Sequence, residues 1–246
     1  MDTAIFSLEQ VTVFFPNGTT NTTILKDISL TLNKGQHIGL YAPNGSGKTT
    51  LLRTITGLHI HKTGRILFHG KEVQNEDDYL PVRQHVGFVL QEASDQIFFP
   101  TVLEDVIFGP LNLGLSSEEA NERALDTLSA LGIDNLAHRL CHQLSGGEKR
   151  LVALAGILAM QPEALLLDEP TTGLDAHARE RLCSILQKLD TSQIIVSHDP
   201  LFLQKVTTAW LTIEEKHLIP ANKPISHTHE HAHIGGGSPH VHTPED

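Results

Sequence analysis

Residues 42–49 (APNGSGKT) constrain the fold most, because they form a phosphate-binding loop between a short apolar segment and a helical pattern. The glycines let successive backbone N–H groups turn inward around a phosphate, and the N-terminus of the following helix adds positive potential. Lys48 is expected to bridge the β- and γ-phosphates, and Thr49 to bind Mg²⁺. Ala42 stands where this type of loop usually has glycine, so it must avoid a positive φ or accept strain.

The segments around this loop alternate between strand and helix patterns. Residues 164–167 and 193–196 are continuous apolar runs, which are typical of central strands in a parallel sheet, and residues 176–189 predict an amphipathic helix. Residues 86–90 predict a further strand that ends at Gln91. This alternation indicates an α/β body.

Two other regions have patterns of their own. Residues 5–15 and 24–32 predict two strands joined by a turn, and residues 92–150 are expected to be helical throughout and inserted into the α/β body. Within that insertion, Ser116 is a predicted N-cap and Gly132 a predicted stop. Between them, apolar residues recur at helical spacing: Ala124, Leu125, Leu128 and Leu131.

Composition limits the class of protein. The 246 residues carry a net charge of −11, which disfavours binding to a polyanion such as nucleic acid. Cys141 and Cys183 form no CxxC pair, and we interpret them as reduced packing thiols of a cytosolic protein. The N-terminus lacks a signal-peptide pattern, and the longest apolar stretch, 151–160, is far short of the roughly 20 residues that span a bilayer. Any association with a membrane is therefore expected to go through protein partners.

The apolar run 164–167 ends in two acidic residues. Asp168 is expected to lie in the Mg²⁺ shell, and Glu169 to polarise the attacking water as general base. For this pair taken alone, a strand that simply runs into a loop is the alternative.

The motifs along the chain resemble, in order and spacing, those of the ATP-binding subunits of ABC transporters. They are the phosphate loop, Gln91, residues 144–148 (LSGGE), Asp168 with Glu169, residues 173–175 (GLD) and His198. The resemblance covers residues 6–219, nearly the whole chain. It implies an α/β, P-loop NTPase (RecA-like) core with an inserted α-helical subdomain and an N-terminal antiparallel β subdomain, which hydrolyses ATP with Mg²⁺.

The resemblance also implies a role for each remaining site residue. Phe15 is expected to stack on adenine, with a core residue at a strand end as the alternative. Gln91 is expected to contact Mg²⁺ and the attacking water, and His198 to sense the γ-phosphate. Asp175 is expected to contact the opposite subunit. The alternatives are a polar strand end for Gln91, a structural histidine for His198 and a plain helix N-cap for Asp175.

The implied site divides into three groups. The catalytic residues are Glu169, His198 and Gln91. The Mg²⁺ ligands are Thr49, Gln91 and Asp168. The nucleotide-binding residues are Phe15, Asn44, Gly45, Ser46, Gly47, Lys48, Thr49, Thr50, Ser145, Gly146, Gly147, Asp168 and Asp175.

Ser145, Gly146 and Gly147 open a predicted helix, so they offer N–H groups and a positive helix end but no lysine. They lie too far along the chain to complete its own site. In the family, this signature stretch caps the γ-phosphate bound to the partner's Lys48, so that ATP joins two subunits and its hydrolysis releases them. An ATP-dependent homodimer is expected, because every catalytic motif is present in this one chain.

Two positions depart from the family's signature. Glu148 stands where the family usually has glutamine, which adds a negative charge near a phosphate. Leu151 stands where an arginine is usual, and Arg150 precedes it.

Residues 91–114 indicate a branch of the family. Asp95 and Gln96, followed by residues 100–102 (PTV) and 108–110 (FGP), resemble the ATPases of energy-coupling-factor importers, which take up cobalt, nickel or vitamins. Residues 153–162 are similar to the same group. In the family this region docks a membrane subunit, and generic packing of the helical subdomain is the alternative.

The residues after Pro220 carry a separate pattern. Their composition has no core-forming periodicity and predicts a flexible tail. Its histidines, several of them in an HxH rhythm, suit chelation of Ni²⁺, Co²⁺, Cu²⁺ or Zn²⁺. They are His227, His229, His231, His233, His240 and His242. A polar tail or the remnant of an expression tag is the alternative, and the spaced rhythm favours metal binding.

Together these observations predict a peripheral ATPase on the cytoplasmic face of a membrane, bound to integral membrane transport subunits and powering import of cobalt or nickel. Residues 1–91 and 162–219 are expected to form the nucleotide-binding core with its β subdomain, residues 92–161 the α-helical signature subdomain and residues 220–246 the tail. The alternatives are the ATPase of a vitamin importer, in which two different ATPases usually pair, and a non-transport ABC ATPase.

Overall fold

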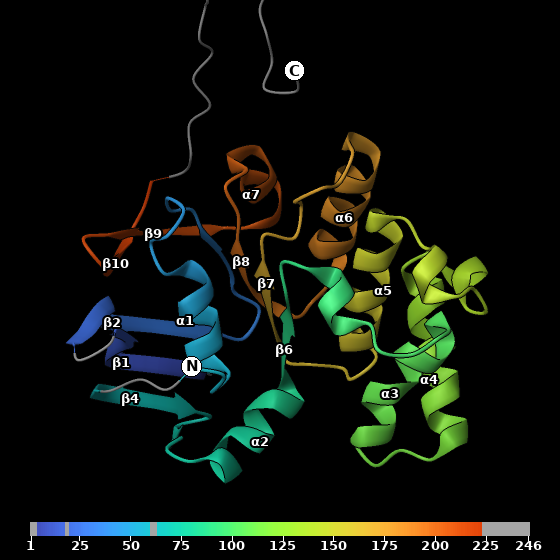
Figure 1. Cartoon of the computed structure of the whole chain (residues 1–246), viewed down its shortest axis with the longest axis horizontal. Coiled ribbons are helices and arrows are strands. Elements are labelled where there is room, and N and C mark those ends of the chain that lie inside the picture. The colour runs from blue at the N-terminus through green and yellow to red at the C-terminus, as the bar shows by residue number, and fades with distance from the viewer. Residues whose placement is uncertain (1–3, 18–19, 60–62, 223–246) are drawn as a thin grey trace, which may run out of the picture.

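The computed structural model describes residues 4–17, 20–59 and 63–222, and its larger sheet has the strand order β10-β9-β3-β8-β7-β6 (Figure 1). All neighbouring strands in this sheet are parallel except β9 and β10. The strands are β3 (His37–Leu40), β6 (Val86–Val89), β7 (Ala164–Asp168), β8 (Ser192–Val196), β9 (Ala209–Glu214) and β10 (His217–Pro220). Strands β7 and β8 are buried along their whole length, as their apolar runs predict.

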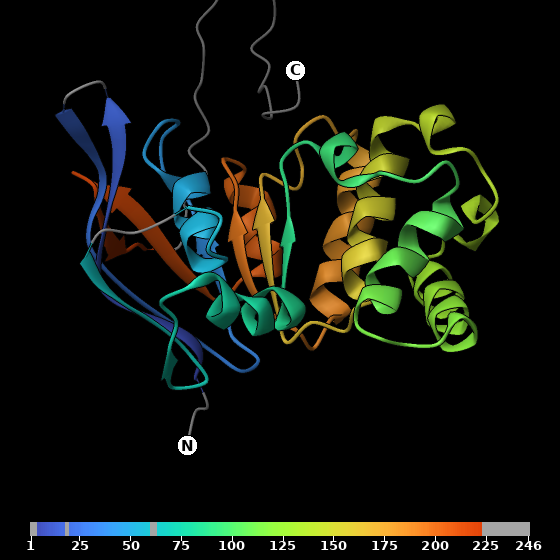
Figure 2. The same cartoon turned by 60° about the horizontal axis from the view of Figure 1, so that its bottom comes forward.

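The smaller sheet is antiparallel and has the order β2-β1-β4-β5. Its strands are β1 (Ala4–Asn17), β2 (Thr20–Asn33), β4 (Thr63–Phe68) and β5 (Lys71–Glu72). The alternation in β2 buries Ile28, Leu30 and Leu32 on one face. That face packs into a core shared with the larger sheet, so the small sheet forms one end of the molecule (Figure 2).

Helices fill and cover the rest of the fold. They are α1 (Lys48–Ile55), α2 (Glu76–His85), α3 (Val102–Asn112), α4 (Ser117–Ala130), α5 (Gly146–Leu158), α6 (Ala176–Lys188) and α7 (Pro200–Val206). Helix α1 lies between the two sheets, while α3, α4 and α5 gather at the opposite end from the small sheet (Figure 2). In the part of the chain that the structure describes, no helix has the length and apolar character to cross a bilayer.

The buried side chains form three apolar clusters. One lies around α1 and both sheets, one joins α3, α4 and α5, and one joins the larger sheet to α6 and α7. Helix α5 contributes to two of them, because Val152 and Ala155 face the helical cluster and Leu154 faces the sheet cluster. Helix α5 therefore connects the helical end of the molecule to the strands. The division of the chain at residues 91 and 161 stays a prediction.

Residues 92–150 are not helical throughout, contrary to the expectation from sequence. Short 3₁₀ turns occur at Ala93–Gln96, Asp134–Leu136 and Cys141–Gln143, and an isolated β-bridge joins Thr101 to Leu140. The physical reason is local: capping boxes start a new helix after Thr101, Ser116 and Ser145, so the chain must leave the helix before each of them.

Other elements carry too little pattern to be predicted. Helix α2 contains Pro81 and buries only Tyr79 and Val82, and α7 has seven residues. Strand β9 is mostly half-buried, and β10, at the edge of the sheet, is half-buried or exposed. These elements are fixed by the neighbours that they pack against rather than by periodicity.

The parallel strands all end at one edge of the larger sheet. The phosphate loop follows β3, Gln91 follows β6, Glu169 follows β7 and His198 follows β8. This edge is where ligands of open α/β sheets bind.

Two leucines of α4 test the assignment of the helical cluster. Leu128 is fully buried in it, whereas Leu125 is 39% exposed. Leu128→Ala should lower the free energy of unfolding by about 2–5 kcal/mol, because it removes apolar contacts and leaves a cavity. Leu125→Ala should change it by roughly 0.5 kcal/mol or less, because the side chain is half in water and alanine favours the helix. Urea titration followed by circular dichroism measures both, and equal losses would contradict the assignment.

Candidate active site

The phosphate loop takes the conformation that its glycines allow. Gly45 and Gly47 have φ angles of 76° and 101°, in the region that favours glycine. A Cβ on Gly47 would lie 2.9 Å from Leu25 Cδ2, so the close approach of β2 also requires glycine there. Ala42 has no positive φ and is buried, so its replacement of the usual glycine causes no backbone strain. Gly47 also caps α1 without a side-chain hydrogen bond, which leaves the N-terminal amides of the helix for an anion.

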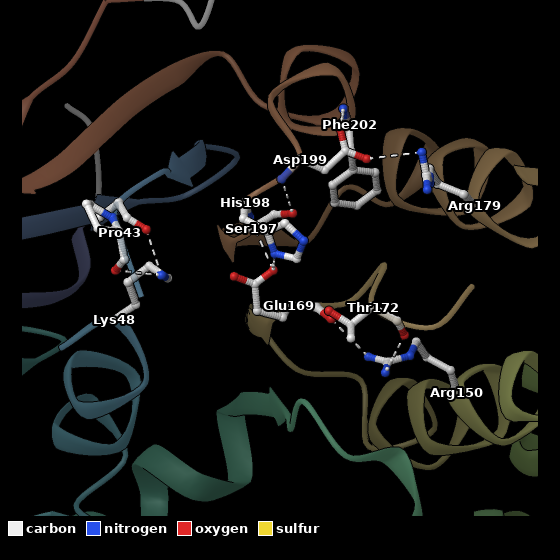
Figure 3. Close-up of polar contacts among 11 residues, drawn as sticks. Pro43, Lys48, Arg150, Glu169, Thr172, Arg179, Ser197, His198, Asp199 and Phe202 are labelled. Carbon is white, nitrogen blue, oxygen red and sulfur yellow. Dashed lines mark hydrogen bonds and ion pairs between the residues drawn. The ribbon is translucent and has the colours of Figure 1, made fainter. Parts of the chain in front are cut away.

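Lys48 curls back onto its own loop. Its Nζ donates to the carbonyl oxygens of Ala42 at 2.7 Å and Pro43 at 3.0 Å (Figure 3). The ammonium is buried and holds no carboxylate among the described residues. It can exchange these neutral carbonyls for phosphate oxygens, which are stronger acceptors for a charged donor.

Asp168 lies at the end of β7 with an unsatisfied oxygen. The residue is buried, and its Oδ1 has no hydrogen-bond partner in the described part of the chain. Burial raises the pKa of Asp168 above its ordinary value, and a hydrogen bond to Thr49 partly opposes that rise. The Ser46 hydroxyl in the loop is also buried without a partner. A hard cation fits the orphaned oxygen of Asp168, and the Thr49 hydroxyl lies within hydrogen-bond distance of the same carboxyl. Thr49 and Asp168 therefore suit Mg²⁺, which would neutralise the carboxylate and the phosphates beside it.

Glu169 is held by His198. The Glu169 Oε2 accepts from the backbone N–H of His198 at 3.2 Å, and lies 2.7 Å from His198 Nδ1 (Figure 3). Glu169 has a φ of 47°, an uncommon conformation for a residue with a side chain, and its N–H donates to the Val196 carbonyl at 2.9 Å. His198, which follows β8, thus holds the Glu169 carboxylate at the pocket.

These residues line one pocket of about 420 Å³, a volume within the range of small-molecule sites. The lining includes Phe15, Ile24, Asn44, Gly45, Gly47, Lys48, Thr49, Thr50, Gln91, Asp168, Glu169, Thr172 and His198. Phe15 is 42% exposed and stacks on His59, with ring centroids 4.5 Å apart. The exposure disfavours a plain core role for Phe15 and leaves adenine stacking as our interpretation.

The signature residues Ser145, Gly146 and Gly147 do not line this pocket. Ser145 caps α5 through a hydrogen bond from the Glu148 N–H, and a Cβ on Gly146 would meet nothing within 4 Å. Asp175 also lies outside the pocket, where its Oδ1 caps α6 by accepting from the Ala178 N–H at 2.7 Å. The chain therefore brings the phosphate loop and the strand ends together, and keeps its own signature apart from them.

The two departures from the signature have local explanations. Glu148 Oε2 accepts from the Ser145 N–H at 2.8 Å, and its Oε1 lies 3.2 Å from Arg139 Nη1. The hydrogen bond from Ser145 lowers the pKa of Glu148, so the carboxylate stays ionised but is paired. Leu151 is buried in the helical cluster. Arg150, beside it, donates to the Glu169 carbonyl. In the sequence, the one sign of this contact is an arginine one position before the usual one.

The tail histidines, His227, His229, His231, His233, His240 and His242, lie outside the described residues. Within residues 4–17, 20–59 and 63–222, no three histidine, cysteine or acidic side chains form a group that could hold a metal ion.

The chain is similar to known proteins over most of its length. The family model described as "ABC transporter" matches residues 25–172. A "Putative ABC transporter ATP-binding protein" of Nitratidesulfovibrio vulgaris is 44% identical over 97% of this chain and 86% of its own. A "Cobalt import ATP-binding protein" of Rhodobacter capsulatus is 47% identical over 76% of this chain and 66% of its own.

Two solved structures are similar as well. The cbiO1 structure from Clostridium perfringens, titled as part of the complex cbiONQ, has a TM-score of 0.79 and 31% identity, covering 89% of this chain and 88% of that one. An ATP-binding cassette solved as a dimer with ADP and phosphate has a TM-score of 0.81 and 27% identity, covering 89% of this chain and 98% of that one.

The buried carboxyl of Asp168 yields a test. Its raised pKa means that ionised Asp168 opposes folding at neutral pH, and that this cost falls as pH drops through the folded-state pKa. Asp168→Asn should therefore raise the melting temperature of the nucleotide-free protein at pH 7 and abolish the extra stabilisation that Mg²⁺ gives with ATP. Thermal unfolding with and without Mg²⁺ measures both. Asp175→Asn, in an exposed cap that asparagine also fills, is the control; a lower melting temperature for nucleotide-free Asp168→Asn would contradict the assignment.

Proposed function

This chain belongs to the ABC transporter family as an ATP-hydrolysing subunit of the energy-coupling-factor type, and we propose that it dimerises on ATP and powers import of cobalt or nickel. The main support for this proposal is that the chain keeps two half-sites apart: the pocket around the phosphate loop and the signature at residues 145–147. Lys48, Asp168 and Glu169 line one pocket, while Gly146 lies outside that pocket, with no atom within 4 Å of where its Cβ would be.

A second copy explains this separation. The amides at the N-terminus of α5 carry partial positive charge, and a neighbouring γ-phosphate is a ligand that such amides favour. Two copies related by a two-fold axis would each supply a phosphate loop to one site and a signature to the other. The similar cassette solved as a dimer with ADP and phosphate supports this arrangement.

Within one such site, each residue has a distinct task. Lys48 would exchange the carbonyls of Ala42 and Pro43 for phosphate oxygens. Thr49 and Asp168 would hold Mg²⁺, which would neutralise the phosphate charge. Glu169, fixed by His198, accepts the proton of the water that attacks the γ-phosphate. Gln91 orients that water, and Phe15 stacks on the adenine.

A groove beside the signature helix α5 offers a docking surface for the membrane subunits. A groove of about 350 Å³ is lined by residues 94 and 97–100 together with Cys141, His142 and Lys149. Phe98 in this lining is 73% exposed, and the ring of its neighbour Phe99 lies 5.1 Å from that of Phe108, which is 42% exposed. Exposed aromatic residues of this kind mark protein interfaces. We infer that a membrane subunit covers them, and that this holds the chain at the cytoplasmic face of the membrane.

Cobalt or nickel is the proposed cargo. The cobalt-import relative of Rhodobacter capsulatus and the cbiO1 structure support it, as does the HxH rhythm of the tail. A vitamin importer of the same type stays the alternative, and labelled uptake with the co-purified membrane subunits separates the two.

Blocking hydrolysis tests the dimer. Glu169→Gln should lower the ATPase rate by about 10²–10⁴-fold, because it removes the general base but leaves the shape of the site. The variant should then accumulate as an ATP-bound dimer in light scattering. Glu163→Gln, just before the same strand, is the control and should match the wild type. A Glu169→Gln protein that binds ATP and stays monomeric would contradict the proposed dimer.

The metal-binding tail has a separate test. Deleting the residues after Pro220 should remove Ni²⁺ and Co²⁺ sites measured by titration calorimetry, because imidazole is a good ligand for both ions. Replacing the six tail histidines by serine in the full chain should give the same loss. An unchanged metal stoichiometry in either variant would contradict metal binding by the tail.

A further inference from the structure

Arg150 is a buried arginine whose guanidinium, among the described residues, donates hydrogen bonds to backbone oxygens alone. It projects from α5 and is 7% exposed. Its Nη2 donates to the Thr172 carbonyl at 3.2 Å, and its Nη1 donates to the Glu169 carbonyl at 3.2 Å (Figure 3). Its Nη2 also donates to the Gln91 carbonyl at 2.8 Å.

This placement costs free energy. No carboxylate lies within ion-pair distance of Arg150 in the described part of the chain. Burial lowers the pKa of Arg150 below its ordinary value, and the charge of Glu92 opposes that shift only in part. A buried charge without a counter-ion is unfavourable unless hydrogen bonds satisfy it. The next residues on the helix, Leu151 and Val152, show that α5 packs well with apolar side chains. Packing alone therefore does not explain an arginine here.

The three carbonyls share a location. Gln91 follows β6, Glu169 follows β7 and Thr172 lies in the turn before α6, and all three residues line the nucleotide pocket. Glu169 also sits at a φ of 47°, a conformation that persists only where its surroundings hold it. Glu169 and Thr172 belong to one turn, in which the Thr172 N–H donates to the Glu169 carbonyl at 3.2 Å, and Gln91 belongs to a second segment. The planar fork of one guanidinium therefore ties α5 to both segments.

The helix that carries Arg150 begins at the signature. Gly146 and Gly147 open α5, and Arg150 follows within the next turn. One short rigid element therefore links the surface proposed to meet a neighbour's nucleotide with the backbone of the chain's own general base.

Resting on the proposed function, we propose that Arg150 is a positioning residue for ATP hydrolysis. It holds the backbones of Gln91 and Glu169 in place for attack on the γ-phosphate, and it transmits displacement of the signature helix to Glu169. Lysine could not replace it, because one ammonium lacks the fork that reaches three carbonyls.

Kinetics with a matched control test this role. Arg150→Met should lower kcat by about 10–100-fold, the scale of a small misplacement of reacting groups, with the Kd for Mg²⁺ and ATP close to that of the wild type. Arg150→Lys should fall between. Arg181→Met is the control, since Arg181 on α6 also donates to two carbonyls, those of Leu131 and Gly132, away from the pocket. It should lose thermal stability but keep kcat.

The outcomes separate cleanly. A kcat for Arg150→Met equal to that of Arg181→Met, or a loss confined to nucleotide affinity, overturns the proposal. If Arg150→Met does not fold, Arg150→Lys decides, and a wild-type kcat in that variant overturns it equally. A wild-type rate per subunit that stays constant on dilution to concentrations at which light scattering finds only monomer contradicts the proposed dimer. The positioning of Glu169 is tested separately, by the Arg150 variants.

Discussion

The parallel pairing of β3, β8, β7 and β6 is the constraint on which the rest of the structure depends. It places at one edge of the sheet the ends of segments that are far apart in sequence, so that Lys48, Gln91, Glu169 and His198 face one pocket. The two central strands, β7 and β8, are buried along their whole length, which anchors this edge of the sheet. Unusual backbone conformations occur in the loops at this edge, and the positive φ angles of Gly45 and Gly47 in the phosphate loop are the clearest example.

The same edge concentrates energetic costs. Asp168 keeps an orphaned oxygen, Lys48 is buried on neutral carbonyls, and Glu169 holds an uncommon φ. We propose that each of these costs is relieved when Mg²⁺ and ATP bind. The signature pays no such cost, because Gly146 opens to free space and Glu148 is paired with Arg139. We interpret this asymmetry as that of one half-site prepared for a nucleotide and another prepared for a neighbour.

The motifs and the central strands could be predicted from the sequence because their physical requirements are local. A phosphate loop needs glycines in a fixed order, and a buried strand needs a continuous apolar run. Helix α2 could not be predicted, since Pro81 interrupts it and its capping box alone starts it. Nor could the difference between Leu125 and Leu128, which depends on where α3 and α5 pack. The contacts of Arg150 could not be predicted for the same reason, because they join α5 to two segments that are distant in sequence, Gln91 and the turn that holds Glu169 and Thr172.

The proposed mechanism requires that two copies share each bound nucleotide. A crystal structure of the hydrolysis-blocked protein with ATP and Mg²⁺ tests this sharing most directly. The measurement is the distance from the γ-phosphate, bound at Lys48, to the backbone amides of Gly146 and Gly147 in a second copy. We predict hydrogen bonds of about 3 Å. A γ-phosphate that meets only solvent, or only residues of its own chain, would contradict the account.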